Sequence, residues 1–287
     1  MRQNNNNIPF MVYQVLDKDT IRIEILPHLS VAKRGFQTKS CLIEVVNSIL
    51  YKLKTGCQWY LLPVRSLFSD VVLSHKTIFG HFRKWCKSGE WEYCWTKILE
   101  KYKSFLDLSS ADLDGSHATA LRGGEEVAYQ GRKKRKTTNS LYLSDRQGLP
   151  LALSNPMAGN HNDIYAIEKS SEELFSALGE AKISTDGLFI NADSGFDSKD
   201  FRLICEKWGV IPNVAFNYRN GESKDAYLLD DLLYKQRYVI ERTNAWMDSF
   251  RSLLNRFDYT VSSWKSFNYI AFMIILFKKI KTNKKSR

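Results

Sequence analysis

The sequence lacks the features of a membrane protein and of a protein crosslinked by metal or disulfides. Its longest apolar run, residues 267–277, has 11 residues and includes Asn268, whereas a membrane-spanning helix needs about 20. The first ten residues, MRQNNNNIPF, contain no apolar signal core. The five cysteines are an odd number and form no C-x-x-C pair, which argues against a zinc ribbon or a complete disulfide framework. We therefore expect a soluble intracellular protein.

The composition is that of an ordinary globular protein. Of the 287 residues, 44% are hydrophobic and 25% are charged, so neither wholesale disorder nor a fibrous protein fits. No internal repeat is visible. At roughly 150 residues per domain, the length predicts one large domain or two modest ones.

The net charge of +11 is unevenly distributed along the chain. Residues 1–106 carry 16 basic and 8 acidic side chains, and residues 278–287 carry six basic and no acidic ones. The stretch between them has a net charge of −3. A basic front and a basic tail indicate that the two ends bind a polyanion; the alternative is that these charges serve only solvation.

The basic front has the pattern of small helices. Apolar residues recur with a helical period over 38–54, where Gly56 closes the helix, and again over 74–87, which Ser74 would cap. A third helix is expected over 91–103. The 74–87 helix pairs an apolar face with a basic one that includes Lys76, Arg83 and Lys84, as a DNA-binding helix-turn-helix requires. A plain helical subdomain with a solvated face is the alternative.

The hydrophobic period changes after residue 106. Strands are expected over 110–114, 139–144 and 149–154, with a turn at Asp145–Gly148. A helix over 163–178, a strand over 187–192, a helix over 199–208, a strand over 210–216 and a long helix over 231–257 follow. Three hairpin strands followed by alternating helices and strands predict a mixed α/β domain, a ribonuclease H-like five-stranded sheet with flanking helices.

Three carboxylates occupy positions that this fold would bring together. Asp114 ends the first strand in LDGSH, Asp193 ends the fourth in NADSGFDS, and Glu241 lies on the last helix. Phosphoryl transfer with two metal ions needs such converging hard oxygen ligands. Each residue alone has an ordinary explanation, a turn or helix cap for the aspartates and an exposed ion pair with Arg237 for Glu241. Together they favour a metal site.

These motifs resemble those of the DDE transposases of bacterial insertion sequences, of the insertion-sequence-five type within the insertion-sequence-four superfamily. The resemblance rests on LDGSH (113–117), NADSGFDS (191–198) and a Tyr-x-x-Arg-x-x-x-Glu signature formed by Tyr234, Arg237 and Glu241. KLKTGCQWYLLP (52–63) and SHKTIFGHFRKWCKSGEW (74–91) resemble the helix-turn-helix region of that family. The resemblance covers about residues 20–275.

The resemblance implies an enzyme that binds terminal inverted repeats and catalyses metal-dependent strand cleavage and strand transfer. Asp114, Asp193 and Glu241 would bind two Mg²⁺ (or Mn²⁺) ions, with Tyr234 and Arg237 as accessory residues. The implied partners are double-stranded DNA, both repeat and target, and a second copy of the chain, in the bacterial cytoplasm and associated with the nucleoid. One position departs from the family, because Asp248 stands where a basic residue is expected.

Further residues have weaker assignments. Five successive basic residues in GRKKRKTT (131–138) fit a phosphate-tracking edge, with a solvated loop as the alternative: Arg132, Lys133, Lys134, Arg135 and Lys136. Four side chains near the site could act as nucleophiles, Ser116, His117, Tyr129 and Tyr142, but the serine and the tyrosines fit phosphate contacts or packing better. His117 and His161 fit phosphate contacts and are not expected to be metal ligands.

The expected organisation is a DNA-binding domain over 1–106, a catalytic domain over 107–277 and a basic tail over 278–287. Two other functions remain open at this point. One is a catalytically inactive, transposase-derived DNA-binding protein. The other is a nuclease or resolvase of the same fold, which would not need the helical front.

Overall fold

A cluster of helices forms the first part of the chain, and their ends follow local sequence signals. The computed structural model describes residues 13–31, 38, 40–217 and 229–285. Gly56 ends the second helix with a left-handed backbone (φ 68°), and Ser74 caps the fourth by accepting a hydrogen bond from the Thr77 N–H. The helices are α1 (Lys18–Thr20), α2 (Leu42–Thr55), α3 (Val64–Leu67), α4 (His75–Lys87) and α5 (Glu90–Tyr102). The three helices predicted for this region are confirmed.

One mixed sheet forms the second part of the chain. Its strands are β1 (Ala111–Thr119), β2 (Ala128–Gln130), β3 (Arg135–Asp145), β4 (Pro150–Leu153), β5 (Met157–Ala158), β6 (Phe189–Ala192) and β7 (Ile211–Val214). β3 pairs antiparallel with β1, β1 pairs parallel with β6, and β6 pairs parallel with β7. β2, β4 and β5 all pair with β3. This strand order is the predicted ribonuclease H-like one, with the short β2 and β5 added.

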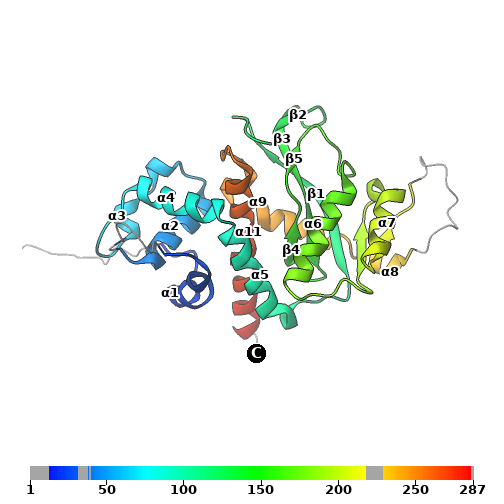
Figure 1. Cartoon of the computed structure of the whole chain (residues 1–287), viewed down its shortest axis with the longest axis horizontal. Coiled ribbons are helices and arrows are strands. Elements are labelled where there is room, and N and C mark those ends of the chain that lie inside the picture. The colour runs from blue at the N-terminus through cyan, green and yellow to red at the C-terminus, as the bar shows by residue number, and fades with distance from the viewer. Residues whose placement is uncertain (1–12, 32–37, 39, 218–228, 286–287) are drawn as a thin grey trace, which may run out of the picture.

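Helices flank the sheet (Figure 1), and the helix between β6 and β7 joins two parallel strands. These helices are α6 (Ile167–Glu180), α7 (Lys199–Lys207), α8 (Asp231–Tyr234), α9 (Val239–Asp248), α10 (Arg251–Leu254) and α11 (Val261–Lys285). None of the helices in the described part of the chain is long and apolar enough to cross a membrane. All five cysteines lie in the described part of the chain and are free thiols there.

The prediction of one long helix over 231–257 is wrong. The segment forms α8, α9 and α10, separated by a turn at 235–238 and by the extended Phe250. Side-chain and tertiary hydrogen bonds compete with helical bonds here. At the end of α9 the Ser249 Oγ donates to the Trp246 carbonyl, and the Lys54 Nζ of α2 donates to the Ser249 carbonyl. Further on, the Arg256 N–H bonds to the Thr119 carbonyl of β1.

The helix predicted from Asp163 begins four residues later, at Ile167. Ala166 adopts a left-handed conformation (φ 50°) before it, and the Asp163 carboxylate accepts a hydrogen bond from the Asn139 side chain of β3. Residues 162–166 therefore form a turn that fixes Asp163 against the sheet instead of extending the helix.

The long helix α11 lies between the helical cluster and the sheet (Figure 1). It packs against α2, α4 and α5 on one side and against α9 and α10 on another. Nearly all of residues 264–277 are buried, which is the behaviour of a helix that is apolar on all sides. The predicted start of the basic tail, residue 278, lies within α11, so the helix carries the tail as far as Lys285.

Candidate functional site

Asp114 and Asp193 lie on the same side of two neighbouring strands. Asp112 of β1 is in register with Asn191 of β6 in a parallel pairing. Because side chains alternate along a strand, the residues two positions further on, Asp114 and Asp193, point to the same face. Asp193 directly follows the last residue of β6, and its Oδ1 accepts the Gly195 N–H at 2.8 Å. The predicted adjacency of these two carboxylates is thus built into the sheet.

Asp114 is largely buried and surrounded by negative charge. Burial raises the pKa of its carboxyl to about 6, with further increases from the charges of Asp163 and Asp193. The Gly115 N–H and the charge of Arg237 act in the opposite direction. Part of the cost of ionising Asp114 is therefore electrostatic, and a cation beside it would remove that part.

Asp163, which the sequence interpretation used only as the start of a helix, lies on the Gly115 side of β1, opposite Asp114, and its charge raises the pKa of Asp114. It lies in GNHND (159–163), between the β-hairpins and α6. Its Oδ1 accepts a hydrogen bond of 2.7 Å from the Asn139 Nδ2. A side chain on Gly115 would collide with it, since a Cβ there would stand 2.0 Å from the same Oδ1. The sequence signal available for Asp163 was its place at the end of the connection between the β-hairpins and the next helix.

Glu241 lies in the first turn of α9, which packs on β1 and β3. Its side chain is exposed. One turn further along the same face, the Asn244 Nδ2 donates to the Asp114 Oδ2 at 3.2 Å. The helix is held by the turn between β3 and β4, where the Thr243 Oγ1 and the Arg242 side chain donate to the carbonyls of Gly148 and Gln147. α9 therefore brings the Glu241 backbone near Asp114.

The two accessory residues of the signature lie just before α9. Arg237 sits in the turn between α8 and α9, with its guanidinium carbon 5.9 Å from the centre of the Tyr234 ring. Its charge also lowers the pKa of Asp112 and Asp114 against the effect of burial. Arg237 is thus near the first strand, as the family resemblance implies for a residue of the site.

The donor set suits a hard divalent cation, although its members do not form a closed cluster. Asp114 and Asp193 offer carboxylate oxygens from adjacent strands, and these are the ligands that Mg²⁺ prefers. Within the described ranges, no three His, Cys, Asp or Glu side chains stand close enough together to hold a metal ion. The exposed Glu241 and the two aspartates are neighbours in the fold without being in mutual contact.

A chain of buried polar groups crosses the sheet beneath this site. The Asn213 Nδ2 of β7 donates to the Asn191 Oδ1 of β6 at 2.8 Å, and the Asn191 Nδ2 donates to the Asp112 Oδ1 of β1 at 2.9 Å. Burial raises the pKa of Asp112 to about 7. These residues fix the register of β1 and β6, and so the pairing of Asp114 with Asp193. The sequence interpretation did not assign them a role.

A polar pocket of about 480 Å³ opens next to the first strand, between the β2–β3 hairpin and α9. It contains Ser116 and His117, which directly follow Asp114 and Gly115 on β1. Three of the five predicted hairpin cations line it: Arg132, Lys133 and Arg135. Asp248 lines it too; burial raises the pKa of its carboxyl, and the charge of Lys133 lowers it.

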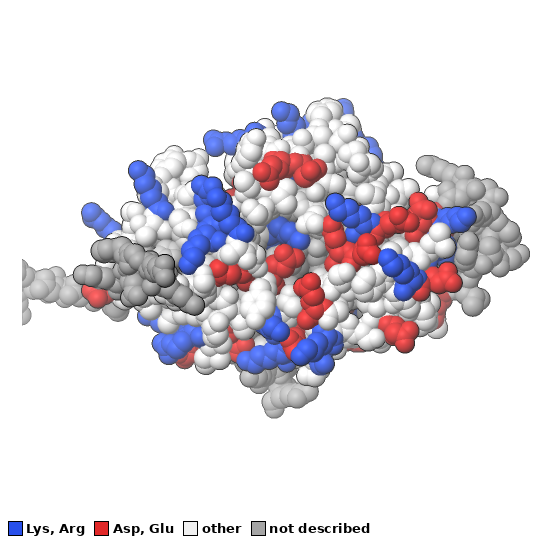
Figure 2. All heavy atoms as spheres, viewed as in Figure 1, with Lys and Arg blue, Asp and Glu red and all other residues white. Residues whose placement is uncertain are grey.

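The basic face predicted for the helix over 74–87 is present on α4. Ile78, Phe82 and Trp85 are buried, whereas Lys76, Arg83 and Lys84 are exposed. Lys84 also donates to the Ser30 carbonyl at 3.3 Å. Figure 2 shows Lys and Arg side chains over the α4 region at upper left and along the top edge, with acidic and basic groups mixed elsewhere. The DNA-binding role assigned to this face of α4 stays a prediction.

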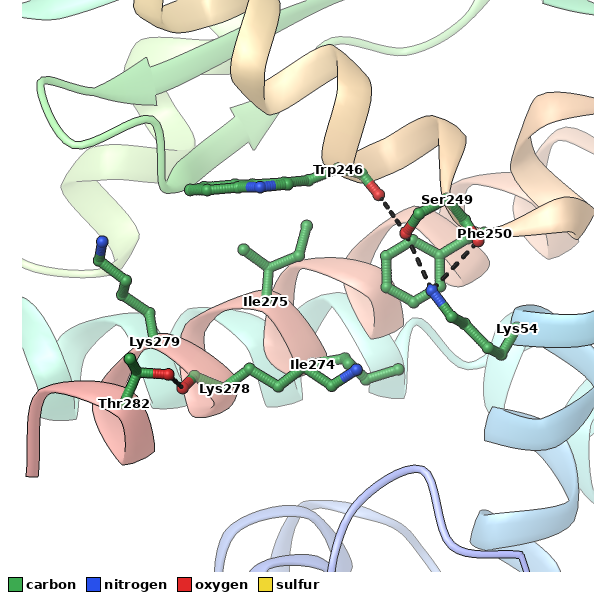
Figure 3. A pocket seen from close by; sticks show the side chains of 9 residues that line it. All are labelled: Lys54, Trp246, Ser249, Phe250, Ile274, Ile275, Lys278, Lys279 and Thr282. Atoms are coloured by element: carbon green, nitrogen blue, oxygen red, sulfur yellow. Dashed lines mark hydrogen bonds between the residues drawn. The ribbon is translucent and has the colours of Figure 1, made fainter. Parts of the chain in front are cut away.

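A second pocket, of about 310 Å³, lies where α2, α9 and α11 meet (Figure 3). Its apolar lining includes Trp246, Phe250 and Ile275, and its cations are Lys54, Lys278 and Lys279. Lys54 is held by hydrogen bonds to the carbonyl and hydroxyl of Ser249. No acidic residue lines this pocket, so it is distinct from the carboxylate site.

The side chains considered as nucleophiles or as phosphate contacts either contact other residues or are exposed. The Tyr142 hydroxyl is buried and donates to the Asn268 Oδ1 at 2.6 Å, which makes Tyr142 a packing residue. His117 contacts the Thr137 hydroxyl at 3.2 Å, and burial lowers the pKa of its imidazole. His161 stacks on Tyr165. Tyr129 is exposed on β2.

Two family models match the chain. A family described as "Putative transposase of IS4/5 family" matches residues 23–95. A family described as "DDE superfamily endonuclease" matches residues 113–278, which is more than half of the chain. Among curated proteins, no sequence matches.

Solved structures of Mos1 transposase are similar at low identity. The "Mos1 transposase paired-end complex with left transposon end" is 13% identical over 86% of this chain and 81% of that chain, with a TM-score of 0.28. The catalytic domain of Mos1 mariner transposase is 12% identical over 72% of this chain and 95% of that chain, also with a TM-score of 0.28. Because both scores are below 0.5, the assignment of the fold rests on the strand order described above.

Proposed function

The chain belongs to the DDE superfamily of endonucleases and is a DNA transposase of the IS4/5 type, and from this premise we propose its substrate and its catalytic residues. It binds the terminal inverted repeats of an insertion sequence, cleaves DNA strands there and joins them to target DNA. Asp114, Asp193 and Glu241 are the proposed catalytic residues, with Tyr234 and Arg237 as accessory residues.

One observation carries the proposed site. Asp114 and Asp193 project from adjacent parallel strands to the same face, and Asn244 of α9 contacts Asp114 at 3.2 Å. Glu241 is one helical turn from Asn244 on the same face of α9, which supports its assignment to this site. The burial of Asp114, which raises its pKa, adds a reason for the site to attract a cation.

Enzymes of this superfamily generally use divalent metal ions, and we propose Mg²⁺ or Mn²⁺, two per site, held by the three carboxylates. When bound, such ions polarise a phosphate oxygen and lower the pKa of an attacking water or 3′-hydroxyl. Arg237, near Asp114, would hold a DNA phosphate at the site. Asn244 would orient the Asp114 carboxylate through its hydrogen bond.

We propose two surfaces for DNA. The exposed Lys76, Arg83 and Lys84 of α4 would bind the repeat, in keeping with a DNA-binding domain over 1–106. The hairpin cations Arg132, Lys133, Lys134, Arg135 and Lys136 would track the strand that enters the catalytic domain over 107–277. The polar pocket beside Ser116 and His117 supports this path because it leads from the hairpin to the strand of Asp114. We further propose that the protein acts as a dimer on DNA.

The test is strand cleavage on labelled DNA that carries the repeats flanking the reading frame, with Mg²⁺ or Mn²⁺. Asp114→Asn, Asp193→Asn and Glu241→Gln should each reduce cleavage at least about 100-fold, and the losses should be non-additive because the groups act as a unit. A gel shift on the same DNA should change little. Glu168→Gln, at an exposed position in the first turn of α6, is the matched control.

The outcomes separate the possible functions. Undiminished cleavage by Glu241→Gln would exclude Glu241 from the site, and cleavage in excess chelator would exclude the metal mechanism. Binding without cleavage by the unaltered protein would indicate an inactive DNA-binding protein. Cleavage of branched DNA without preference for the repeats would indicate a resolvase.

A further inference from the structure

We propose that Asn213 is a positioning residue of the catalytic site, which holds the segment of Arg237 in place against the sheet. This inference rests on the proposed function, since it assigns to Asn213 a part in placing the arginine that would hold a DNA phosphate. It is carried by the hydrogen bonds of the Asn213 side chain, to Asp230 on one side and to Asn191 on the other.

The side chain of Asn213 clamps the backbone of Asp230. Its Oδ1 accepts a hydrogen bond of 2.8 Å from the Asp230 N–H, and its Nδ2 donates to the Asp230 carbonyl at 3.1 Å. An amide side chain that pairs with both backbone groups of one residue takes the place of a neighbouring strand, and so it fixes the path of the chain there. Asp230 also caps α8, because its Oδ1 accepts the N–H groups of Leu232 and Leu233. The clamp therefore sets where α8 begins.

Backbone hydrogen bonds link this starting point to Arg237. The Asp230 carbonyl also accepts the Tyr234 N–H at 2.9 Å, and the Tyr234 carbonyl accepts the Arg237 N–H at 3.0 Å. The Arg237 carbonyl in turn accepts the Ile240 N–H of α9 at 3.1 Å, while α8 itself packs on β6 and β7. A shift at the start of α8 would therefore displace Tyr234 and Arg237, the two accessory residues of the signature.

The same amide joins this segment to the strands that carry the two aspartates. Its Nδ2 donates to the Asn191 Oδ1 at 2.8 Å, and the Asn191 Nδ2 donates to Asp112. Asn213 lies opposite Asn191, and Asn191 opposite Asp112, in the parallel register of β7, β6 and β1. Asp114 and Asp193 follow two residues further along, on the same face of the sheet. One row of hydrogen-bonded side chains thus connects the segment of the arginine with the strands of the aspartates.

The burial of Asn213 indicates a role in geometry rather than in packing. Asn213, Asn191 and Asp112 are each at most 2% exposed, and the Asn213 amide uses both its donor hydrogens and its acceptor. A buried polar group costs free energy unless it is hydrogen-bonded, so apolar side chains would serve packing alone at least as well. A fully bonded buried network instead makes the local structure rigid and unique. We therefore expect Asn213 to affect the rate of cleavage through the placement of Arg237.

The experiment compares Asn213→Ala with a matched control, Asn47→Ala, in the full-length protein. Asn47 of α2 makes a clamp of the same kind, accepting from the Val15 N–H and donating to the Tyr13 carbonyl. Both variants should lower the melting temperature, but only Asn213→Ala should slow single-turnover cleavage of repeat DNA, by about tenfold, because a displaced group slows the chemical step. The Kd for the same DNA should stay within about twofold. Asn213→Thr is a milder variant, since a hydroxyl keeps part of the hydrogen bonding and threonine suits a strand, and its rate should lie between those of Asn213→Ala and the unaltered protein.

A double-mutant cycle with Arg237→Ala separates positioning from a general loss of stability. If Asn213 acts through Arg237, adding Asn213→Ala to Arg237→Ala should slow cleavage by less than about twofold, since the group that it positions is already gone. Rate losses that multiply would overturn the inference. Full activity of Arg237→Ala alone would overturn it as well, because Asn213 would then have no group of the reaction to position.

The results distinguish this inference from the proposed function. Slower cleavage in Asn213→Ala, with Asn47→Ala unchanged and a non-additive cycle, supports the positioning role. Unchanged cleavage in Asn213→Ala and Asn213→Thr, with cleavage lost in Asp114→Asn, overturns it and leaves the catalytic site standing. Equal slowing by Asn47→Ala also overturns it, because the effect would then follow stability. Cleavage retained in Asp114→Asn contradicts the proposed function itself.

Discussion

At the scale of single residues, the carboxylate of Asp114 illustrates how the burial of an acidic group lowers folding stability. Its pKa is raised to about 6 by burial and by neighbouring carboxylates. Because the folded protein holds this proton more tightly than the unfolded chain does, folding stability falls as the pH rises from about 4 to about 6. Asp112 and Asp145, with pKa values raised to about 7 and about 6, act in the same direction.

We predict that Asp114→Asn stabilises the protein above pH 6 when metal is removed. The gain should be about 1–3 kcal/mol at pH 8 and should vanish below about pH 3, where Asp114 is protonated in both states. Urea unfolding in excess chelator between pH 3 and 8 measures it. Asp70→Asn, at an exposed position, should show no such gain. A destabilised Asp114→Asn protein at pH 8 would show that the carboxylate is structural.

A second prediction concerns Asp248, the position that departs from the family. Asp248 shares a pocket with Arg132, Lys133 and Arg135, so it repels phosphates at the place where these cations would attract them. Asp248→Asn should tighten DNA binding roughly two- to fivefold, the usual effect of one surface charge, and Asp248→Lys more. Fluorescence anisotropy at several salt concentrations measures both. Weaker binding would instead mean that Asp248 holds Lys133 in place.

Residue types and spacing were sufficient to predict that Asp114 and Asp193 share a face of the sheet, but not where Asp163 lies. Asp114 and Asp193 follow buried strands, and the pattern of such strands is local. Asp163 contacts Gly115 and Asn139, which lie 48 and 24 positions earlier in the sequence. Its place depends on how the turn before α6 meets the sheet, and no periodicity records that contact.

At the scale of elements, helices with one apolar face were predictable and the divided helix was not. α4 begins at Ser74 as its cap indicated. The segment 231–257 has no strong breaker, yet it divides because the chain bonds elsewhere, as the bridge between Thr119 and Asn255 shows. Tertiary contacts overrode helix propensity there. Because the segment is divided, α9 packs on β1 and the chain can then turn toward the start of α11.

The exposed face of α4 is the element for which we predict DNA binding. Replacing Lys76, Arg83 and Lys84 with Ala should weaken binding to repeat DNA. The slope of log affinity against log salt concentration should become shallower by about one for each phosphate that the protein no longer contacts. The melting temperature should fall only slightly, because, of these three side chains, only Lys84 has a hydrogen bond to another described residue. The control triple variant replaces the exposed Lys103, Lys169 and Lys199 and changes the net charge equally. Equal losses of affinity in both variants would contradict a specific role for α4.

At the scale of the whole molecule, α11 makes one core of the helical cluster and the sheet. Phe267 stacks on Phe82 of α4 with ring centres 4.4 Å apart. Phe272, one and a half turns later, contacts Trp95 of α5 and Tyr142 of β3. From the sequence, residues 267–277 could be identified as an apolar run too short to span a membrane. Which parts of the molecule this run joins could not be predicted, because its contacts are with residues more than a hundred positions away. The two domains that we propose over 1–106 and 107–277 thus share buried contacts through α11.

This shared helix predicts that the two parts unfold together. Phe267→Ala, on the side of α4, and Phe272→Ala, toward the sheet, should each lower the free energy of unfolding by about 3–5 kcal/mol, since both rings are fully buried. Hydrogen exchange should then show that the most protected amides of α4 and of β3 lose protection by the same amount in either variant. Tyr259→Ala, at a position 70% exposed, should change neither. If Phe267→Ala loosened α4 while β3 kept its protection, the helical cluster would be a separate folding unit, and α11 would hold it to the sheet only as a linker.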